Sequence, residues 1–254
     1  MTGITVMEQD HELTGRLAGI YRPALTALRD CLPEGQGFSL PLFMTPSPEY
    51  AVAGLKLMIV GQETHSWYSH LHDLANYPDV AAIQQRYSRF ALGHGYDSPF
   101  WRAVLKIQAA LVPHVPRFGF VWTNLFPCDQ DKTMPTVKWH DALRAHSPFR
   151  AELEILKPDL VVCFTGPRYD YTLRHYFPEA AWSNVASESG PLLHRLTVPA
   201  GPHLVLRTYH PNYLVWRKIL ERTVAEIVHL AHALFTRTTA VPVAVAASRE
   251  PSIK

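Results

Sequence analysis

Four short apolar segments recur along the chain, each bounded by glycine or by polar residues. They are LKLMIVGQE (55–63), FGFVWTNLF (118–126), DLVVCFTG (159–166) and HLVLRTYH (203–210). Nearly continuous apolar runs of this length are typical of parallel strands that are buried on both faces. Each segment therefore predicts one strand of a central sheet.

Helical patterns separate these strands. Asp97, Ser98 and Pro99 are typical of a helix start and predict a helix over 100–111, and 147–158 predicts a capped helix that leads into the third strand. Residues 212–235 carry an apolar stripe at helical spacing and predict one long amphipathic helix. Strands that alternate with helices predict an α/β fold, a three-layer α/β/α sandwich around a mostly parallel four-stranded sheet.

Three further segments complete this organisation. Residues 8–31 have apolar positions at helical spacing with an expected break near Pro23, and 32–50 are rich in Pro, Gly and Ser. Residues 191–198 are a candidate for an extra short strand. We expect an N-terminal helical extension and loop over 1–50, the main domain over 51–235 and a flexible tail over 236–254.

Composition excludes some classes of protein. The 254 residues are 47% hydrophobic and 18% charged, which is enough to bury one substantial core. No apolar stretch is long enough to cross a bilayer, and the first residues lack the pattern of a signal peptide. We therefore expect a cytoplasmic monomer. The net charge of +2 is too small to indicate a nucleic-acid binder by itself, so any contact with a polyanion requires a local basic patch.

The cysteines predict no covalent framework. Cys31, Cys128 and Cys163 are scattered and form no C-x-x-C pair, which disfavours both a disulfide scaffold and a thiolate metal cluster. Neither Cys128 nor Cys163 lies in a sequence context typical of a nucleophile. We interpret each cysteine as a small buried apolar residue.

The carboxyl ends of the predicted strands carry the polar side chains of greatest chemical interest. Ligands of open α/β sheets bind at this edge, and here it holds a carboxylate at Glu63, an amide at Asn124 and an imidazole at His210. A carboxylate stabilises a developing cation, an amide recognises a polar heterocycle, and an imidazole stabilises an oxyanion. This combination suits the cleavage of a bond to a heterocyclic leaving group.

Four motifs at these strand ends resemble a known family. IVGQETH (59–65), WTNLFPC (122–128), EILKPDLVVCFTG (154–166) and TYHPNYLVWR (208–217) are similar, in this order, to motifs of the uracil-DNA glycosylase superfamily. The first motif resembles the classical branch and the last resembles the iron-sulfur bacterial branch. The resemblance covers residues 55–235 and implies a DNA-binding enzyme that flips a base out of the stack and hydrolyses its N-glycosidic bond. Such an enzyme serves base-excision repair or defence against modified foreign DNA.

The resemblance also implies roles for the central residues. Glu63 matches the classical aspartate that orients water or stabilises the sugar cation, whereas the iron-sulfur branch places its glutamate at Gln62. The acidic position is thus assigned to Glu63 by only one of the two alignments. Asn124 matches the asparagine that hydrogen-bonds the uracil edge, and His210 matches the histidine that stabilises charge on the leaving base.

Further positions are implied to contact the base or the DNA. Phe90 or Phe100 stacks on the base, depending on the branch used to align, and Tyr213 or Leu214 wedges into the gap that the flipped base leaves. The implied substrate-binding set is Gly61, Gln62, His65, Phe90 and Phe100. The implied DNA-binding set is Asn212, Tyr213, Leu214, Arg217 and Lys218, of which the last two reach phosphates.

Two departures from the family change the expectations. The four cysteine ligands of the iron-sulfur branch are absent, so we expect neither a cluster nor any other cofactor. His65 replaces the tyrosine that excludes a 5-methyl group in the classical branch. Uracil, a deaminated purine and a pyrimidine with a larger 5-substituent all stay open as substrates.

Other interpretations stay open as well. Taken singly, Asn124 suits a loop cap, His210 a strand end, the two phenylalanines the core, and Arg217 and Lys218 a solvated helix face. A protein of the same fold that binds nucleic acids or nucleotides without catalysis is the first alternative. A metal-dependent hydrolase is the second, with ligands from His65, His70, His72 and Asp73, although no H-E-x-x-H spacing occurs.

Overall fold

Four parallel strands form the centre of the sheet in the computed structural model, which describes residues 3–115, 118–185 and 192–239. The strands are β1 (Leu57–Gly61), β2 (Phe120–Asn124), β3 (Leu160–Phe164) and β6 (Leu204–Thr208). Every residue in them is buried, which explains their unbroken apolar sequences. All four predicted strands are confirmed, with bounds slightly inside the predicted ranges.

The sheet contains two strands beyond the predicted four, and one of them, His194–Thr197, lies within the candidate short strand over 191–198. Its order is β2-β1-β3-β6-β5-β4, in which β5 (His194–Thr197) pairs antiparallel with β6, and β4 (Ala181–Asn184) pairs antiparallel with β5. The prediction of four strands was therefore wrong. Strand β4 was missed because three of its four residues are exposed, so it carries no apolar run.

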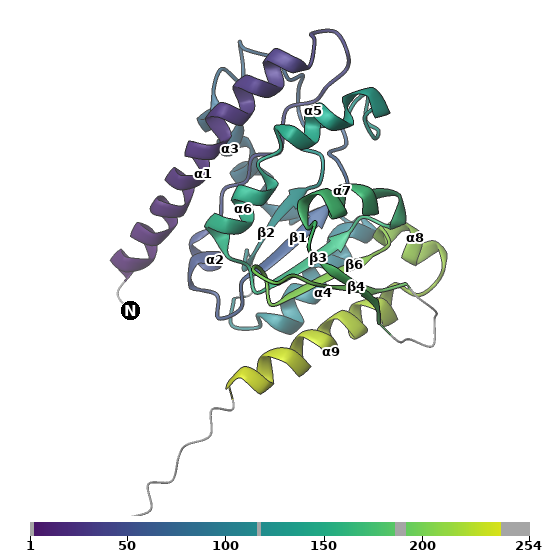
Figure 1. Cartoon of the computed structure of the whole chain (residues 1–254). Coiled ribbons are helices and arrows are strands. Elements are labelled where there is room, and N and C mark those ends of the chain that lie inside the picture. Colours follow the sequence, from purple (N-terminus) through teal and green to yellow (C-terminus); the bar gives the residue numbers. More distant parts are fainter. Residues whose placement is uncertain (1–2, 116–117, 186–191, 240–254) are drawn as a thin grey trace, which may run out of the picture.

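Helices lie on both sides of this sheet, which confirms the α/β class. Figure 1 shows α6 (Phe149–Leu156) and α7 (Asp170–Tyr176) on one side, and α4 (Pro99–Leu111) and α9 (Leu220–Thr239) on the other. The remaining helices are α1 (Gly3–Cys31), α2 (Pro48–Val52), α3 (Val80–Phe90), α5 (His140–Ala145) and α8 (Pro211–Trp216), with the 3-10 turns η1 (Ala91–Gly93), η2 (Val137–Trp139) and η3 (Pro167–Tyr169).

Helix α4 begins where its sequence indicates. The Ser98 side chain accepts a hydrogen bond from the Trp101 amide, and Pro99 occupies the first helical position. A proline costs little there because the first amides of a helix have no intrahelical acceptor. The predicted helix over 100–111 is confirmed and starts one residue earlier.

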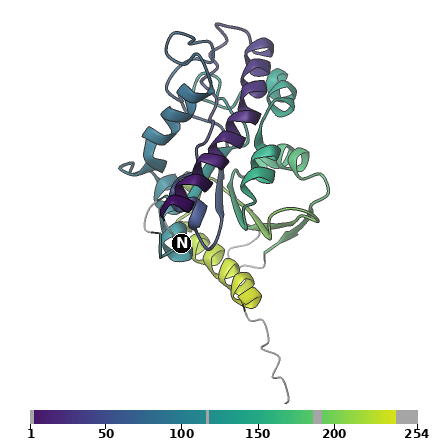
Figure 2. The same cartoon turned by 90° about the vertical axis from the view of Figure 1, so that its left-hand side faces the viewer.

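Helix α1 is part of the same core as the sheet. It continues through Pro23, so the predicted break is wrong. Tyr21 stacks on Phe43 with ring centroids 4.3 Å apart, and its hydroxyl donates to Glu152 of α6 over 2.9 Å. These buried contacts hold the helix around the proline, which costs one backbone hydrogen bond. Figure 2 shows α1 lying between α3 and α6.

The predicted long C-terminal helix is two helices. Lys218 adopts a left-handed conformation with a φ of 58° and ends α8. Its amide donates to the Val215 carbonyl over 2.9 Å, and the Ile219 amide donates to the Leu214 carbonyl over the same distance. This pair of bonds is the Schellman pattern of a helix end. Arg217 and Lys218 therefore lie in an exposed turn rather than along a helix face.

Helix α9 runs to Thr239, so the prediction of a tail from residue 236 is wrong for 236–239, and 240–254 lie outside the described residues. Among the residues that the structure describes, no helix is long and apolar enough to span a membrane.

Candidate active site

Gly61 and Asn124 meet at the carboxyl ends of β1 and β2. They are register partners, and a Cβ atom at position 61 would lie 2.2 Å from the Asn124 Oδ1 atom. Only glycine leaves room for the amide, which is why this glycine is needed although its backbone conformation is ordinary for a strand. Asn124 is only 3% exposed, so the amide is fixed inside the protein.

The Asn124 amide has unused hydrogen-bonding capacity. Its Nδ2 atom is buried and has no acceptor among the described residues. The same holds for Trp122 Nε1, which would lie 3.3 Å from a Cβ atom at position 61. A buried donor without a partner costs free energy, so two of them at one strand end need an explanation. A ligand acceptor that reaches the Asn124 amide would satisfy that donor.

His210 follows β6 and caps α8. Its Nδ1 atom accepts a hydrogen bond from the Asn212 amide over 3.2 Å, so the proton of the neutral ring lies on Nε2. Burial disfavours the charged form and lowers the pKa of His210 to about 4. At neutral pH this side chain is an uncharged donor through Nε2.

The two candidate stacking residues have different surroundings. Phe100 lies nearly parallel to His210, with ring centroids 5.8 Å apart and planes inclined by 19°. Phe90 instead packs against Trp67, Trp101 and Trp122 at centroid distances of 5.2, 5.4 and 5.6 Å. The structure therefore brings Phe100 to the imidazole and places Phe90 in an aromatic cluster beside it.

Glu63 lies two residues beyond β1 on a well-held backbone. The Leu125 and Phe126 amides donate to the Gly61 and Gln62 carbonyls over 3.1 and 3.0 Å, which extends the β1–β2 pairing past the strands. The Gln62 side chain donates to the Thr165 carbonyl over 2.8 Å. The Gln62 side chain is thus bound to the loop that follows β3. Of the two candidate positions for the catalytic acidic residue, only position 63 carries a carboxylate.

The Glu63 carboxylate has a partner that the sequence analysis missed. Its Oε2 atom accepts a hydrogen bond from the hydroxyl of Tyr169, in η3. Burial raises the pKa of Glu63, while the Tyr169 hydrogen bond and the nearby Arg168 act in the opposite direction. The only sequence signal for Tyr169 is its place just after the Gly-Pro that follows β3.

His65 contacts a different part of the chain. It is exposed, and its Nδ1 atom is 2.7 Å from the Lys132 carbonyl. The preceding Thr64 is buried and donates to Asp129 over 2.7 Å. The hydrogen bond to Lys132 directs His65 to the 130–133 turn, so the structure does not bring it to Asn124 or His210 as the substrate-binding prediction implied.

The histidine-rich segment does not form a metal centre within 3–115, 118–185 and 192–239, where no three His, Cys, Asp or Glu side chains gather. His72 Nε2 is 2.7 Å from the Leu32 carbonyl, and Asp73 accepts from Ser69 over 2.5 Å. These two candidate ligands are thus hydrogen-bonded to other groups of the protein. Cys128 and Cys163 are buried as predicted, and burial raises the pKa of both thiols, whereas Cys31 is half-buried.

The side chain that α8 exposes most is neither of the two that were predicted to act as the wedge, Tyr213 and Leu214. Leu214 is 0% exposed and belongs to the core, which argues against its predicted wedge role. Tyr213 is half-buried and stacks on Tyr209 with centroids 4.4 Å apart. Trp216, which the sequence analysis did not single out, is 72% exposed beside the exposed Arg217. Asn212 and Lys218 are also exposed.

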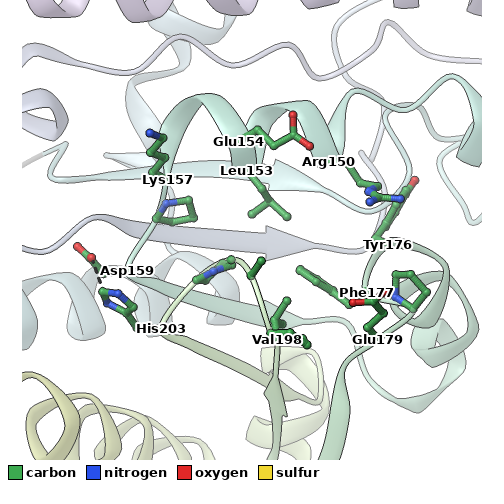
Figure 3. Close-up of a pocket in the computed structure, with 16 residues that line it drawn as sticks. Arg150, Leu153, Glu154, Lys157, Asp159, Tyr176, Phe177, Glu179, Val198 and His203 are labelled. Carbon is green, nitrogen blue, oxygen red and sulfur yellow. Dashed lines mark ion pairs between the residues drawn. The ribbon is translucent and has the colours of Figure 1, made fainter.

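A separate cavity of about 830 Å³ is lined by residues at the amino ends of β3 and β6 and by residues of α6. Asp159 immediately precedes β3 and His203 immediately precedes β6, and their side chains form an ion pair at 3.6 Å (Figure 3). Figure 3 also shows Tyr176 and Phe177 lining the cavity at some distance from this pair. The cavity contains none of the predicted site residues.

Comparisons with known proteins add no assignment. A scan against protein-family models found no match to this chain, and a search of curated proteins found none either. The case for a function therefore depends on the residues at the carboxyl ends of the parallel strands.

Proposed function

We propose that this protein is a DNA glycosylase, similar to the uracil-DNA glycosylase superfamily, which hydrolyses the N-glycosidic bond of uracil or another modified base. The observation that carries the proposal is the buried Asn124 amide, whose Nδ2 donor lacks an acceptor among the described residues. Gly61 makes room for that amide at the edge where α/β proteins bind ligands. A flipped base has the polar edge that such a donor recognises.

The state of His210 supports the departure of a base as an anion. A neutral imidazole with its proton on Nε2 donates a hydrogen bond to a carbonyl oxygen of the base as negative charge develops there. Phe100 lies beside the imidazole and offers an aromatic ring to the base. Together they accommodate a planar heterocycle whose polar edge reaches Asn124.

Glu63 supplies the negative charge that faces the cationic sugar. Tyr169 holds one carboxylate oxygen, and the other oxygen is left to orient water and to stabilise the cationic sugar. In the reaction the bond between C1′ and the base breaks, and its electron pair leaves with the base. The oxygen of water bonds to C1′, and a proton of that water passes to Glu63 and then to solvent.

Helix α8 supports an interaction with DNA. Trp216 is exposed on the same short helix that His210 caps, and Arg217 and Lys218 follow it. An aromatic side chain fills the gap in a base stack, and the two cations contact phosphates. Trp216 replaces Leu214 as the proposed wedge because Leu214 is buried.

Oligonucleotides that each carry one modified base test the proposal. The set includes uracil, hypoxanthine and 5-hydroxymethyluracil, which represent the three open substrate classes, in single- and double-stranded form. Alkali converts each abasic site to a strand break, and we expect breaks at one or more of these bases with or without chelator. Glu63→Gln and His210→Ala should each slow cleavage by about 10²-fold or more while the fold persists.

Two outcomes distinguish the alternatives. DNA binding without cleavage of any base would support the non-catalytic binding protein. Cleavage that a chelator abolishes would support the metal-dependent hydrolase instead.

A further inference from the structure

A second hollow lies beside the loop that follows β1. It has a volume of about 330 Å³ and is lined by residues of that loop, including Tyr68 and Asn76, and by Arg86 and Arg89 of α3. The two arginines are three residues apart on one helix, so both face the same side. This hollow is smaller and more polar than the cavity that Asp159 and His203 line.

Arg86 is held in place but is not neutralised. Its guanidinium carbon lies 3.3 Å from the centre of the Tyr68 ring, and its Nε atom is buried without an acceptor among the described residues. Within the described part of the chain, neither Arg86 nor Arg89 forms an ion pair with a carboxylate. Guanidinium groups present several donors suited to phosphate oxygens, so this arrangement favours an anionic ligand.

One carboxylate also lines the hollow. Asp73 accepts hydrogen bonds from Ser69 over 2.5 Å and from Asn76 Nδ2 over 3.1 Å. Both carboxylate oxygens of Asp73 are thus hydrogen-bonded to residues of its own loop. Two arginines against one such carboxylate leave the hollow with a positive balance.

The loop is fixed in a strained conformation. Ser66 and Tyr68 have φ values of 57° and 61°, in the left-handed region that side chains other than glycine rarely adopt. Arg29 of α1 holds the loop through hydrogen bonds to the Leu71 and Tyr77 carbonyls over 3.1 and 2.7 Å. Strain of this kind persists where the surrounding structure enforces it, and it is most frequent at functional sites.

The position of the hollow indicates what it binds. Its loop begins directly after Glu63 at the end of β1, whereas α8 begins at the end of β6, and β3 separates these two strands. Figure 1 shows α3, which carries the two arginines, and α8 on opposite sides of β1 and β3, so the hollow and α8 flank the candidate active site. We infer that the hollow binds a backbone phosphate of the DNA strand, on the side of the flipped nucleotide that is remote from α8. This inference rests on the proposed glycosylase function.

Binding measurements with substituted arginines test the inference. The variants are Arg89→Gln, Arg86→Gln/Arg89→Gln and, as a matched control, Arg150→Gln, whose side chain is exposed and lines the other cavity. The probes are a fluorescent single-stranded oligonucleotide and thymidine 3′,5′-bisphosphate. Arg89 is exposed, so its single variant tests the site even if the double variant folds poorly.

We expect the double variant to bind the oligonucleotide about tenfold more weakly, with the slope of log K against log salt reduced by about 0.7 for one lost phosphate contact. Arg89→Gln should give a smaller loss and Arg150→Gln none. Equal affinity and slope in the double variant and the wild type would overturn the inference.

The bisphosphate separates this inference from the proposed function. If the wild type binds it and the double variant does not, the phosphate site stands even where no base is excised, and only the glycosylase proposal fails. If bases are excised at wild-type rates by the double variant and bisphosphate binding is unchanged, the glycosylase proposal stands and the phosphate site is refuted.

Discussion

Asn124 lies opposite Gly61 at the ends of two neighbouring parallel strands, and its Oδ1 atom would be 2.2 Å from a Cβ atom at position 61. Gly61→Ala should therefore displace the amide, and we expect base excision to fall about tenfold or more because substrate positioning tolerates little error. Gly54→Ala is the control, since a Cβ atom there meets nothing within 4 Å. Unchanged excision in Gly61→Ala would show that the Asn124 amide does not position the base.

The Tyr169 hydroxyl favours the ionised form of Glu63 by donating to it. Tyr169→Phe removes that donor, so the pKa of Glu63 should rise further. The active form is the carboxylate, and the acid limb of the rate profile should thus move to higher pH. Tyr171→Phe is a matched control because the Tyr171 hydroxyl is paired with His140. An identical profile for the wild type and Tyr169→Phe would contradict this role.

His210 should stay neutral throughout the neutral pH range, since burial lowers its pKa to about 4. Nitrogen chemical shifts, assigned by comparison with His210→Gln, should report the Nε2-protonated tautomer because Nδ1 accepts from the Asn212 amide. In the unfolded chain this histidine binds a proton at a higher pH, so its contribution to stability falls as the pH is lowered from about 6.5 towards 4. A ring that titrates near 6.5 would contradict the neutral-donor role.

Glu152 makes stability depend on pH in the opposite direction. It is buried with two hydroxyl partners, Tyr21 and Thr123, and burial raises its pKa from 4.5 to about 7. The folded state binds the extra proton between these values, so the stabilisation is complete below about 4.5 and is lost as the pH rises through about 7.

Denaturant titrations of Glu152→Gln measure this effect. Between pH 5 and 8 the free energy of unfolding of the wild type should fall by about 2–3 kcal/mol more than that of the variant. Glu154→Gln is the control, because Glu154 is exposed on the same helix. Parallel pH curves for the wild type and Glu152→Gln would show that Glu152 does not titrate in this range.

Leu214 and Trp216 should separate stability from DNA binding. Leu214→Ala removes a fully buried side chain and should lower the free energy of unfolding by about 2–5 kcal/mol. Trp216→Ala removes an exposed side chain and should change it by less than about 0.5 kcal/mol, yet weaken DNA binding about tenfold. Wild-type DNA affinity and excision in Trp216→Ala would exclude it as the wedge.

The sequence predicted those parts of the fold whose signal is local. Buried strands such as Leu57–Gly61 have unbroken apolar sequences, and Ser98 with Pro99 identified the start of α4. Strand β4 was missed because three of its four residues are exposed and it carries no apolar run. The break between α8 and α9 was missed because Lys218 has no side-chain feature that indicates a left-handed conformation.

The candidate site was predicted in the same uneven way. Gly61 and Asn124 end apolar strands and His210 follows one, so their position at the carboxyl ends of the parallel strands follows from the topology. The sequence did not show which residue of α8 faces solvent, so Leu214, which is buried, was a candidate wedge and the exposed Trp216 was not singled out. The bond between Tyr169 and Glu63 joins segments 106 residues apart, and no local pattern predicts such a pairing.

Mass spectrometry of the products formed from an oligonucleotide with one modified base shows directly whether the protein excises that base. We expect a free base and an abasic strand with intact phosphodiester bonds, and a loss of both products in Glu63→Gln and His210→Ala. Intact oligonucleotides after incubation of the wild type with uracil, hypoxanthine and 5-hydroxymethyluracil substrates would contradict this expectation, as would undiminished product formation by both variants.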